Sequence, residues 1–328
     1  MKKEKIDMVY LWCDGSDPEF KKRKNFYKTQ IDKLDDGAAT EERFFDNEEL
    51  KYSLRSLEKY APWINHVFIV TDRQIPKFLN LKCSKVSIVD HSEIMPKEII
   101  PCFNSTVLEY FLPYIPNLQE KFLYANDDMF FGDNVYPKDF FVEDKPIVKV
   151  KSSKHYGTLE KARKFFKNQG PLDGCALNAN EILFSLYRKS EKDIFYVASH
   201  NIDAYSKHIF LECNKKYEKY IKSFLHHRFR EGSDIQRLFT LDLVYSGEGI
   251  LKDVTAPKPW RRFLHPLINC DWECYMDSDQ SPKLEKEILK YKPKLFCINS
   301  GSNTSLERKK QIKNFMEQLF PEKSMFEN

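Results

Sequence analysis

Two adjacent acids follow an apolar run in the segment FLYANDDMFFGD. Asp127 and Asp128 come directly after Asn126 and the run Phe122–Tyr124, which is typical of a buried strand. Adjacent carboxylates in an aromatic setting repel each other unless a cation neutralises them, and Mg²⁺ or Mn²⁺ commonly joins carboxylates to substrate phosphates. Asp127 and Asp128 are therefore candidate metal ligands. A solvated turn that caps a helix explains the same spacing equally well.

The segment DGSDP, from Asp14 to Pro18, ends the first predicted strand. In an α/β sheet such a position faces the ligand-binding crevice and suits the base, ribose or metal of a nucleotide. Asp14 and Asp17 are the candidate binding groups. The motif is weak evidence by itself, because its residues are turn formers and an ordinary turn explains it better.

Further polar residues surround the start of a predicted helix. Arg43, Asp46 and Asn47 lie at this start, and Arg55 lies nine residues beyond Asp46 on the same helix. A helix N-terminus with a nearby arginine can hold a phosphate. Taken one by one, these residues fit a capped surface helix with solvated charges better.

A histidine and an arginine-rich run complete the candidate chemistry. His200 in ASHNID could act as a general base on a sugar hydroxyl, although a single histidine is more often structural. Arg228 and Arg230 in LHHRFREGSDIQ could clamp a diphosphate, because the guanidinium fork fits oxyanions. Asp234 in the same run is a candidate substrate-binding residue.

Composition limits the classes of protein to consider. The 328 residues are 41% hydrophobic and 31% charged, as in globular proteins, and the net charge of +4 does not favour a nucleic-acid partner. The Walker, Gly-x-Gly-x-x-Gly and Gly-x-Ser-x-Gly motifs are absent from the sequence. Scattered cysteines favour a reducing compartment, and Cys270 and Cys274, the one close pair, fit buried thiols better than zinc. We expect neither a signal peptide nor a membrane span, and a cytoplasmic location.

Alternating strand and helix patterns predict the elements that carry these residues. The patterns predict strands at Ile6–Trp12, Val67–Val70, Val86–Val89 and Phe122–Tyr124, with helices at 46–60 and 104–112. The first helix is expected to begin with a capping box from Asp46 to Glu49. Strands separated by helices predict an α/β fold with a largely parallel sheet.

The rest of the chain divides into two further parts. Residues 154–249 have a mostly helical pattern, with a second capping box expected from Ser233 to Gln236. Residues 250–328 return to α/β, with a strand at Leu295–Ile298 and a helix capped by Thr304 and Glu307. We therefore expect residues 1–328 to form a single unit, in which an α/β half (1–153) and a C-terminal return (250–328) flank a helical insert (154–249).

In combination, these blocks resemble the Stealth family of sugar-1-phosphate transferases. The resemblance rests on IDMVYLWCDGSDP, on the long block from RFFDNEELKYSLRSLEKYAPW to FLYANDDMFFG, on ASHNIDAYSK with HHRFREGSDIQ, and on KPKLFCINSGSNT with FPEKSMFE. It implies a Rossmann-like core and a UDP-sugar donor. The implied reaction transfers a hexose-1-phosphate, with N-acetylhexosamine-1-phosphate favoured, to a glycan hydroxyl and releases UMP. Capsular or cell-wall polysaccharide synthesis in the bacterial cytoplasm is the implied setting, with peripheral contact to the inner membrane or to other synthesis proteins.

The resemblance also assigns roles to residues at matching motif positions. The family's acids near the metal and the diphosphate correspond by resemblance to Glu109, Asp127 and Asp128. The general base of the family corresponds to His200, and its phosphate-binding arginine corresponds to Arg230. The positions expected to bind the nucleotide or substrate are Asp14, Asp17, Arg43, Asn47, Arg55 and Asp234.

One position departs from the family pattern. The last region usually reads Asn-Asp, whereas this chain has Asn299 and Ser300. Serine brings no charge to a metal or a base, and Asp271, Asp277 or Asp279 could supply a substitute acid. Two alternatives to phosphotransfer stay open, and Ser300 motivates the second. One is a metal-dependent glycosyltransferase that releases UDP, and the other is a weakened homologue that only binds glycans.

Overall fold

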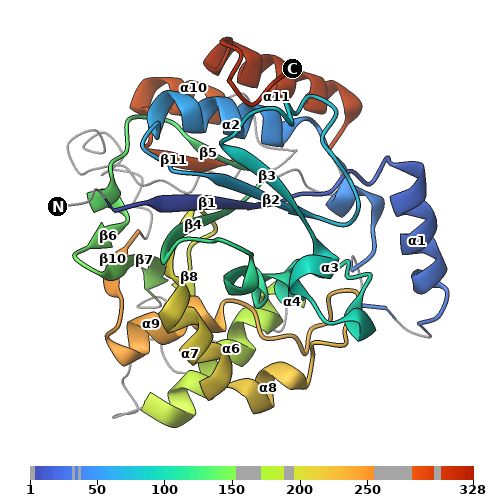
Figure 1. Cartoon of the computed structure of the whole chain (residues 1–328), viewed down its shortest axis with the longest axis vertical. Coiled ribbons are helices and arrows are strands. Elements are labelled where there is room, and N and C mark those ends of the chain that lie inside the picture. Colours follow the sequence, from blue (N-terminus) through green and yellow to red (C-terminus); the bar gives the residue numbers. More distant parts are fainter. Residues whose placement is uncertain are drawn as a thin grey trace.

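The computed structural model describes residues 4–31, 34–35, 38–152, 171–187, 196–254, 283–298 and 304–328. Its central sheet has the strand order β3-β2-β1-β4-β9 (Figure 1). The strands are β1 (Ile6–Leu11), β2 (Val67–Thr71), β3 (Val86–Asp90), β4 (Lys121–Asn126) and β9 (Asp203–Ser206). The first four are parallel and β9 is antiparallel to β4. The expected α/β fold with a largely parallel sheet is confirmed.

Burial on both faces explains why β1 lies at the centre of the sheet. All six of its residues are buried, and successive side chains point to opposite faces. Val9 packs into a cluster with the helices below the sheet in Figure 1, whereas Tyr10 packs with the helix above it. A continuous apolar run is the expected pattern for a strand covered on both sides.

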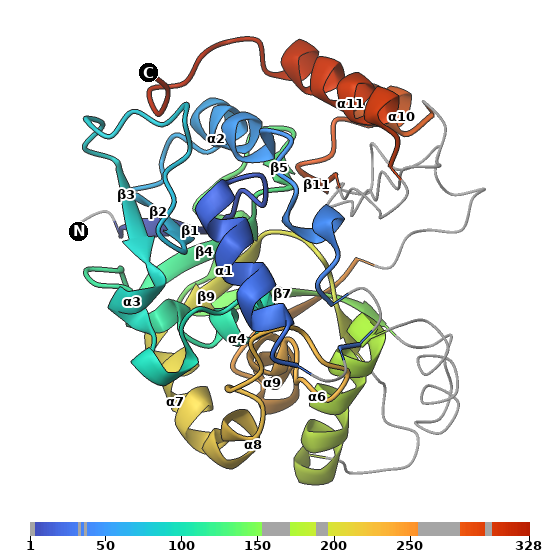
Figure 2. The same ribbon diagram turned by 90° about the vertical axis from the view of Figure 1, so that its right-hand side faces the viewer.

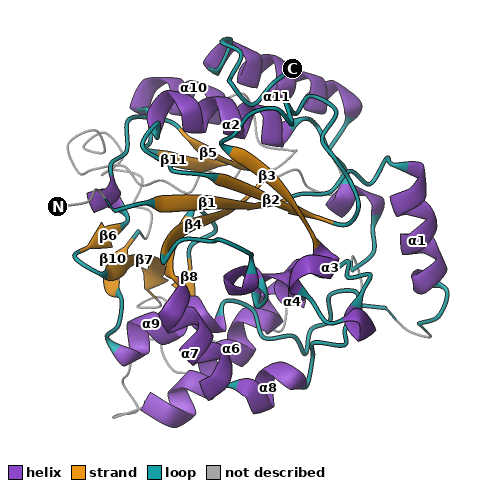
Figure 3. Ribbon diagram, viewed as in Figure 1, coloured by secondary structure: helices purple, strands orange, loops and turns teal. Residues whose placement is uncertain are grey.

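Helices cover both faces of the sheet (Figure 3). On one face lie α2 (Glu49–Tyr60), α10 (Lys283–Tyr291) and α11 (Leu306–Leu319). On the other lie α3 (His91–Ile94), α4 (Ser105–Glu109), α6 (Pro171–Tyr187), α7 (Lys207–Lys216), α8 (Glu218–Lys222) and α9 (Leu238–Ser246). Figure 2 views the carboxyl ends of the parallel strands, with α1 (Pro18–Lys28) in front. Short 3₁₀ turns occur at Glu41–Phe44, Lys97–Ile99, Leu112–Tyr114 and Pro137–Asp139. None of the described helices is both long enough and apolar enough to cross a membrane.

Two smaller sheets connect distant parts of the chain. In one, β5 (Met129–Phe131) pairs antiparallel with β11 (Leu295–Cys297), which joins the C-terminal part to the segment after β4. The other contains β6 (Phe141–Val142), β7 (Lys145–Ser152), β8 (Tyr196–Ala198) and β10 (Ile250–Asp253). The described part of 154–249 is mostly helical, and its strand β9 forms an edge of the central sheet.

Both capping boxes expected from the sequence are wrong. Helix α2 follows Glu48, whose φ is 66°, and α9 follows Arg237, whose φ is 59°; neither side chain caps its helix. The chain enters both helices through a left-handed residue, so the acceptors at Asp46 and Ser233 lie too far upstream to cap. The cap of α11 is Ser305, one residue later than expected, and its Oγ accepts a hydrogen bond from the Arg308 backbone N–H.

Arg55 joins α2 to the C-terminal segment and does not bind in the cavity described below. Its Nε and Nη2 donate to the Glu327 carboxylate at 2.9 and 2.8 Å, and its Nη1 donates to the Phe320 carbonyl at 2.8 Å. Glu317 lies 3.2 Å from the same guanidinium. The expectation that Arg55 lines a nucleotide site is therefore wrong. Arg55 lies about one and two-thirds turns beyond Glu49, the first residue of α2, and its side chain contacts the tail motif.

Replacement of Arg55 by alanine should lower stability without changing nucleotide affinity. The Glu327 side chain is only 4% exposed, so the variant leaves a buried carboxylate unpaired. We expect a loss of about 3 kcal/mol in the free energy of unfolding, measured by urea denaturation. Lys59→Ala, on the exposed side of the same helix, is the control and should change stability by about 0.5 kcal/mol or less. Loss of nucleotide binding by a folded Arg55→Ala protein would contradict the structural role.

Candidate active site

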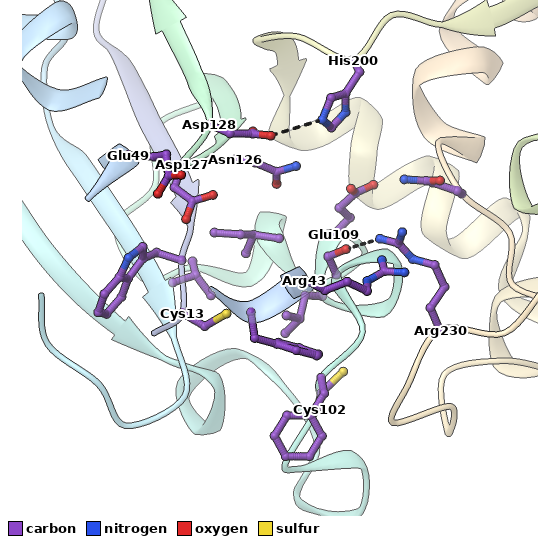
Figure 4. Close-up of a pocket in the computed structure, with 18 of the residues that line it drawn as sticks. Cys13, Arg43, Glu49, Cys102, Glu109, Asn126, Asp127, Asp128, His200 and Arg230 are labelled. Atoms are coloured by element: carbon purple, nitrogen blue, oxygen red, sulfur yellow. Dashed lines mark hydrogen bonds and ion pairs between the residues drawn. The ribbon is translucent and has the colours of Figure 1, made fainter. Parts of the chain in front are cut away.

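A cavity of about 890 Å³ opens at the carboxyl ends of the parallel strands (Figure 4). Cys13 follows β1 in this cavity, Asp72 follows β2, and Asp127 follows β4. The carboxyl ends of parallel strands meet at one edge of the sheet, so these loops converge without any sequence proximity. The volume is in the usual range for a small-molecule site.

Carboxylates cluster on one wall of the cavity, where Figure 4 shows Glu49 and Asp127 side by side. Burial raises the pKa of Asp127 well above its usual value, and the charges of Asp128 and Glu49 raise it further. The pKa of Glu49 is raised to about 8, mainly by burial. Such a cluster is costly unless a cation compensates it. From the sequence, Glu49 was expected only to cap a helix, and no local pattern indicated that it would line the cavity.

His200 faces this acid turn from the loop between β8 and β9. Its Nε2 lies 3.8 Å from Asp128 Oδ2 (Figure 4). One ligand atom from each of Asp128, His200 and Cys297 lies within 4.8 Å of the others. Among the described residues, the buried Asp128 Oδ1 has no hydrogen-bond partner. The residues therefore fit a bound cation: the carboxylates suit Mg²⁺ or Mn²⁺, whereas the imidazole and the thiol suit softer metals such as Zn²⁺.

Cys297 comes to this site through the β5–β11 pairing. The backbone N–H of Ile298, which follows β11, donates to the Asp128 carbonyl at 2.8 Å. This bond fixes the C-terminal segment against the acid turn. From sequence alone, Cys297 was visible only as part of the last family motif.

Arginines lie across the cavity from the carboxylates, as Figure 4 shows for Arg43 and Arg230. Arg230 is buried, and its Nη2 donates to Ser105 Oγ at 2.6 Å. Burial lowers the pKa of Arg230, and the pKa of Arg43 is lowered to about 10 by burial and then by the charge of Arg230. Two neighbouring guanidinium groups, one buried at Arg230 and one more exposed at Arg43, form a site for an anion.

Glu109 lies next to this arginine wall in a buried network. Its Oε1 accepts a hydrogen bond from the Tyr124 hydroxyl at 3.2 Å, and its Oε2 is 3.9 Å from Arg237 Nε. Arg237 also donates to Asp203 and lines the cavity. The structure therefore pairs Glu109 with an arginine that the sequence analysis missed. The signal in the sequence was weak, since Arg237 follows the matched motif by one residue.

Asp234 is buried beneath the loop that carries Arg230 and does not line the cavity. Its carboxylate accepts hydrogen bonds from Asn104 Nδ2 at 2.7 Å and from the Glu231 N–H at 3.0 Å, and its Oδ1 lies 2.7 Å from His227 Nδ1. Asp234 therefore lies outside the cavity lining, and its expected role in substrate binding stays a prediction. Asp234 positions the arginine loop.

Three other expected binding residues also lie outside the cavity lining. Asp17 caps α1 by accepting a hydrogen bond from the Phe20 N–H at 2.7 Å. Asp14 accepts one from the Ser16 N–H at 2.8 Å, and Asn47 Nδ2 donates to the Lys309 carbonyl at 3.3 Å. Their motifs do reach the cavity, but through the neighbouring residues Cys13 and Glu49. Ser300, Asn299, Asp271, Asp277, Asp279, Cys270 and Cys274 lie outside the described residues.

Comparison with known proteins places this α/β fold and its acid-lined cavity in a family. Models described as Stealth protein CR1, conserved region 1, and Stealth protein CR2, conserved region 2, match residues 4–32 and 43–148. The capsular polysaccharide phosphotransferase cps12A of Actinobacillus pleuropneumoniae is 32% identical over 92% of this chain and 78% of its own length. LcbA of Neisseria meningitidis, of the same description, is 33% identical over 90% of this chain and 77% of its own length. The chain belongs to the Stealth family of phosphotransferases, as the sequence blocks suggested.

Other matches are shorter or more distant. The capsular polysaccharide phosphotransferase cps1A of Actinobacillus pleuropneumoniae is 35% identical over 70% of this chain, and the match spans 62% of that relative. Among solved structures, the galactosyltransferase LgtC superimposes with a TM-score of 0.45 and 9% identity, covering 95% of this chain and 96% of LgtC. The bifunctional glycosyltransferase WbbM superimposes with a TM-score of 0.49 and 10% sequence identity. The superposition covers 98% of this chain and 50% of WbbM.

The His227–Asp234 contact should make stability depend on pH. The hydrogen bond with Asp234 raises the pKa of His227 above its usual value. The resulting stabilisation is complete below about pH 6.5, the unfolded value, and disappears as the pH rises through the higher folded-state value. The difference in Tm between wild type and His227→Gln should therefore shrink from pH 6 to pH 9. His208→Gln, at an exposed histidine of α7, should leave the profile unchanged, and parallel wild-type and His227→Gln profiles would contradict the linkage.

Proposed function

We propose that this protein transfers a hexose-1-phosphate from a UDP-sugar to a glycan hydroxyl and releases UMP. The favoured unit is N-acetylhexosamine-1-phosphate, and the favoured process is the synthesis of a capsular or cell-wall polysaccharide in the bacterial cytoplasm. The observation that carries the proposal is the division of charge in one cavity, with carboxylates on one wall and Arg43 and Arg230 on the other. This arrangement suits a diphosphate held between a cation and guanidinium groups. The names of the relatives support the same class of reaction.

In the proposed reaction, the acceptor oxygen attacks the β-phosphorus of the donor. A new phosphorus–oxygen bond forms to the glycan, and the bond from the β-phosphorus to the bridging oxygen breaks, so that UMP leaves with that oxygen. His200 Nε2 accepts the hydroxyl proton of the acceptor, and Asp128 Oδ2 at 3.8 Å stabilises the resulting imidazolium. A bound Mg²⁺ or Mn²⁺ would be held by Asp127 and Asp128, and it would neutralise phosphate charge.

Arg230 has the role of holding the donor phosphates. A buried guanidinium needs a compensating anion, and the described neighbours give Arg230 a hydroxyl contact while its Nε is buried without a hydrogen-bond partner. Asp234 fixes the loop on which this arginine lies. Ser105, at the start of α4, orients the guanidinium toward the cavity.

Activity should require both a divalent cation and Asp127. Asp127→Asn removes one of the charges that repel each other on the acid wall, so the fold should persist while turnover is lost. The assay incubates a panel of UDP-sugars with an acceptor glycan and Mg²⁺ or Mn²⁺ and identifies the released nucleotide by chromatography. We expect UMP. Release of UDP would indicate glycosyl transfer instead, and undiminished activity in excess EDTA would exclude the metal role.

Removal of the His200 imidazole should slow the reaction and leave the donor bound. His200→Ala is expected to lower kcat by about 10²–10⁴-fold with little change in donor affinity, because the histidine acts on the acceptor. Steady-state kinetics and a separate titration with the donor measure the two effects. A variant that unfolds or fails to bind donor would show that the residue is structural.

Lysine should not replace Arg230, because a point charge cannot make a two-oxygen contact. Arg230→Lys is expected to weaken donor affinity by about tenfold or more. Arg228→Lys is the matched control, since Arg228 donates to the carbonyls of Pro101 and Glu98 and does not line the cavity. Equal effects of the two substitutions on the KM for the donor would argue against a specific phosphate contact.

A further inference from the structure

One end of the cavity takes no part in the proposed reaction. It contains Asp72, after β2, and His91, the first residue of α3, together with three phenylalanines described below. In Figure 4, Cys13 and Cys102 mark the end of the cavity opposite His200. Asp72, His91, Phe20, Phe44 and Phe103 are called the aromatic end here.

Three phenylalanines border this end of the cavity and pack into one buried cluster with Phe229. Phe103 lies edge-on to Phe20 with ring centroids 5.4 Å apart, and Phe20 lies 5.8 Å from Phe44. The ring of Phe229 stacks on the ring of Phe103 with the two centroids 5.1 Å apart, and this contact supports the position of Phe103. Rigid aromatic rings in a cavity bind planar heterocycles by stacking, and they do so for any base.

Two buried polar atoms at the aromatic end have no hydrogen-bond partner among the described residues. Asp72 is 1% exposed; its Oδ2 accepts from Arg23 Nε and Nη2 at 3.0 and 2.9 Å, whereas its Oδ1 accepts no hydrogen bond. Arg73 Nε lies 3.8 Å from this Oδ1, too far for a hydrogen bond. His91 is 4% exposed, and its Nδ1 is also without a partner. Buried polar groups are normally paired, so these two atoms can pair with the polar edge of a ligand.

The two polar groups offer different hydrogen bonds. The Asp72 carboxylate offers acceptor oxygens, and Arg23 donates two hydrogen bonds to its Oδ2. Burial lowers the pKa of His91 to about 4, so its imidazole is neutral near pH 7 and donates from Nδ1 in one tautomer. An acceptor beside a donor complements the N–H and C=O groups that are neighbours on a uracil ring.

We propose that the aromatic end binds the nucleobase of the donor nucleotide. Asp72 Oδ1 accepts a ring N–H of the base, His91 faces the same polar edge, and the rings of Phe20 and Phe103 stack against the heterocycle. The phosphates then extend toward Arg43, Arg230 and the acid wall. This assignment rests on the proposed function for the identity of the ligand as a nucleotide sugar.

The test compares ligands that differ only in the base. Isothermal titration calorimetry of the whole chain with Mg²⁺ measures the dissociation constants of UMP, CMP, AMP, GMP and ribose 5-phosphate. In the wild type, UMP should bind at least about tenfold more tightly than ribose 5-phosphate, because a stacked and hydrogen-bonded base adds affinity.

Two variants remove the base contacts by different routes. In Asp72→Asn the amide oxygen stays with Arg23, so an NH₂ donor faces the cavity in place of the acceptor. Phe103→Leu keeps apolar volume and removes the ring face. Each variant should weaken the affinity for UMP by about tenfold and change the affinity for ribose 5-phosphate by about twofold or less. If Asp72→Asn lowers Tm too far to be titrated, Phe103→Leu still decides the question.

Two controls separate the base from the rest of the ligand. Asp90→Asn makes the same substitution at the end of the neighbouring strand, where asparagine also caps α3 and the side chain does not line the cavity. It should leave UMP affinity unchanged. Arg230→Lys should weaken the binding of UMP and of ribose 5-phosphate by the same factor, because both ligands carry a phosphate.

The outcomes separate this proposal from the proposed function. Equal wild-type binding of UMP and ribose 5-phosphate overturns the base site, as does an unchanged ratio between them in both variants. If binding depends on the base and the variants abolish this dependence, the base site is supported. This holds even if the protein releases no UMP from UDP-sugars, and in that case only the proposed function fails. If UMP is released and the ratio is unchanged, the base site fails alone.

Discussion

Desolvated charge at the carboxyl ends of the strands is the constraint on which the site depends. Asp127, Asp128 and Glu49 share one wall, and the raised pKa values of Asp127 and Glu49 show the cost of placing their charges together out of water. A protein tolerates such a cluster when function supplies the compensating charge. The buried guanidinium of Arg230 on the far wall requires a compensating negative charge instead. One ligand that carries phosphates and a cation satisfies both walls.

Several long-range contacts keep the two walls apart. The β5–β11 pairing and the Ile298–Asp128 hydrogen bond fix the acid turn from one side. On the other side, Asp234 holds the loop of Arg230 through contacts with Asn104 and Glu231. If either wall relaxed, the opposite charges would approach each other and close the site. Rigid support is therefore as necessary as the charged groups themselves.

The C-terminal motif contributes to the same rigidity from a distance. Glu327 receives two hydrogen bonds from Arg55, and these hold the tail against α2, whose first residue is Glu49. A family motif that resembles part of a binding site can thus act by fixing a helix that bears an acid. The aromatic end shows the converse, because Asp72, His91 and Phe103 line the cavity although none was selected from the sequence.

The sequence by itself determined the strands, the largely parallel sheet and the stretches near the site. Apolar runs bounded by turn residues predicted β1 to β4, since burial on both faces leaves that pattern directly in the residues. Family blocks singled out Arg43, Glu109, Asp127, Asp128, His200 and Arg230, all of which line the cavity.

Only the tertiary structure decided which side chain of each motif faces the cavity. Asp14, Asp17, Asn47 and Arg55 lie in or beside the same blocks as cavity residues but bind other parts of the protein. A helix rotates successive side chains by about 100°, and a left-handed residue before α2 moves its start, so neighbours in sequence face different surroundings. Cys297 and Arg237 reached the site through pairings between segments far apart in the chain. No local pattern encodes such contacts.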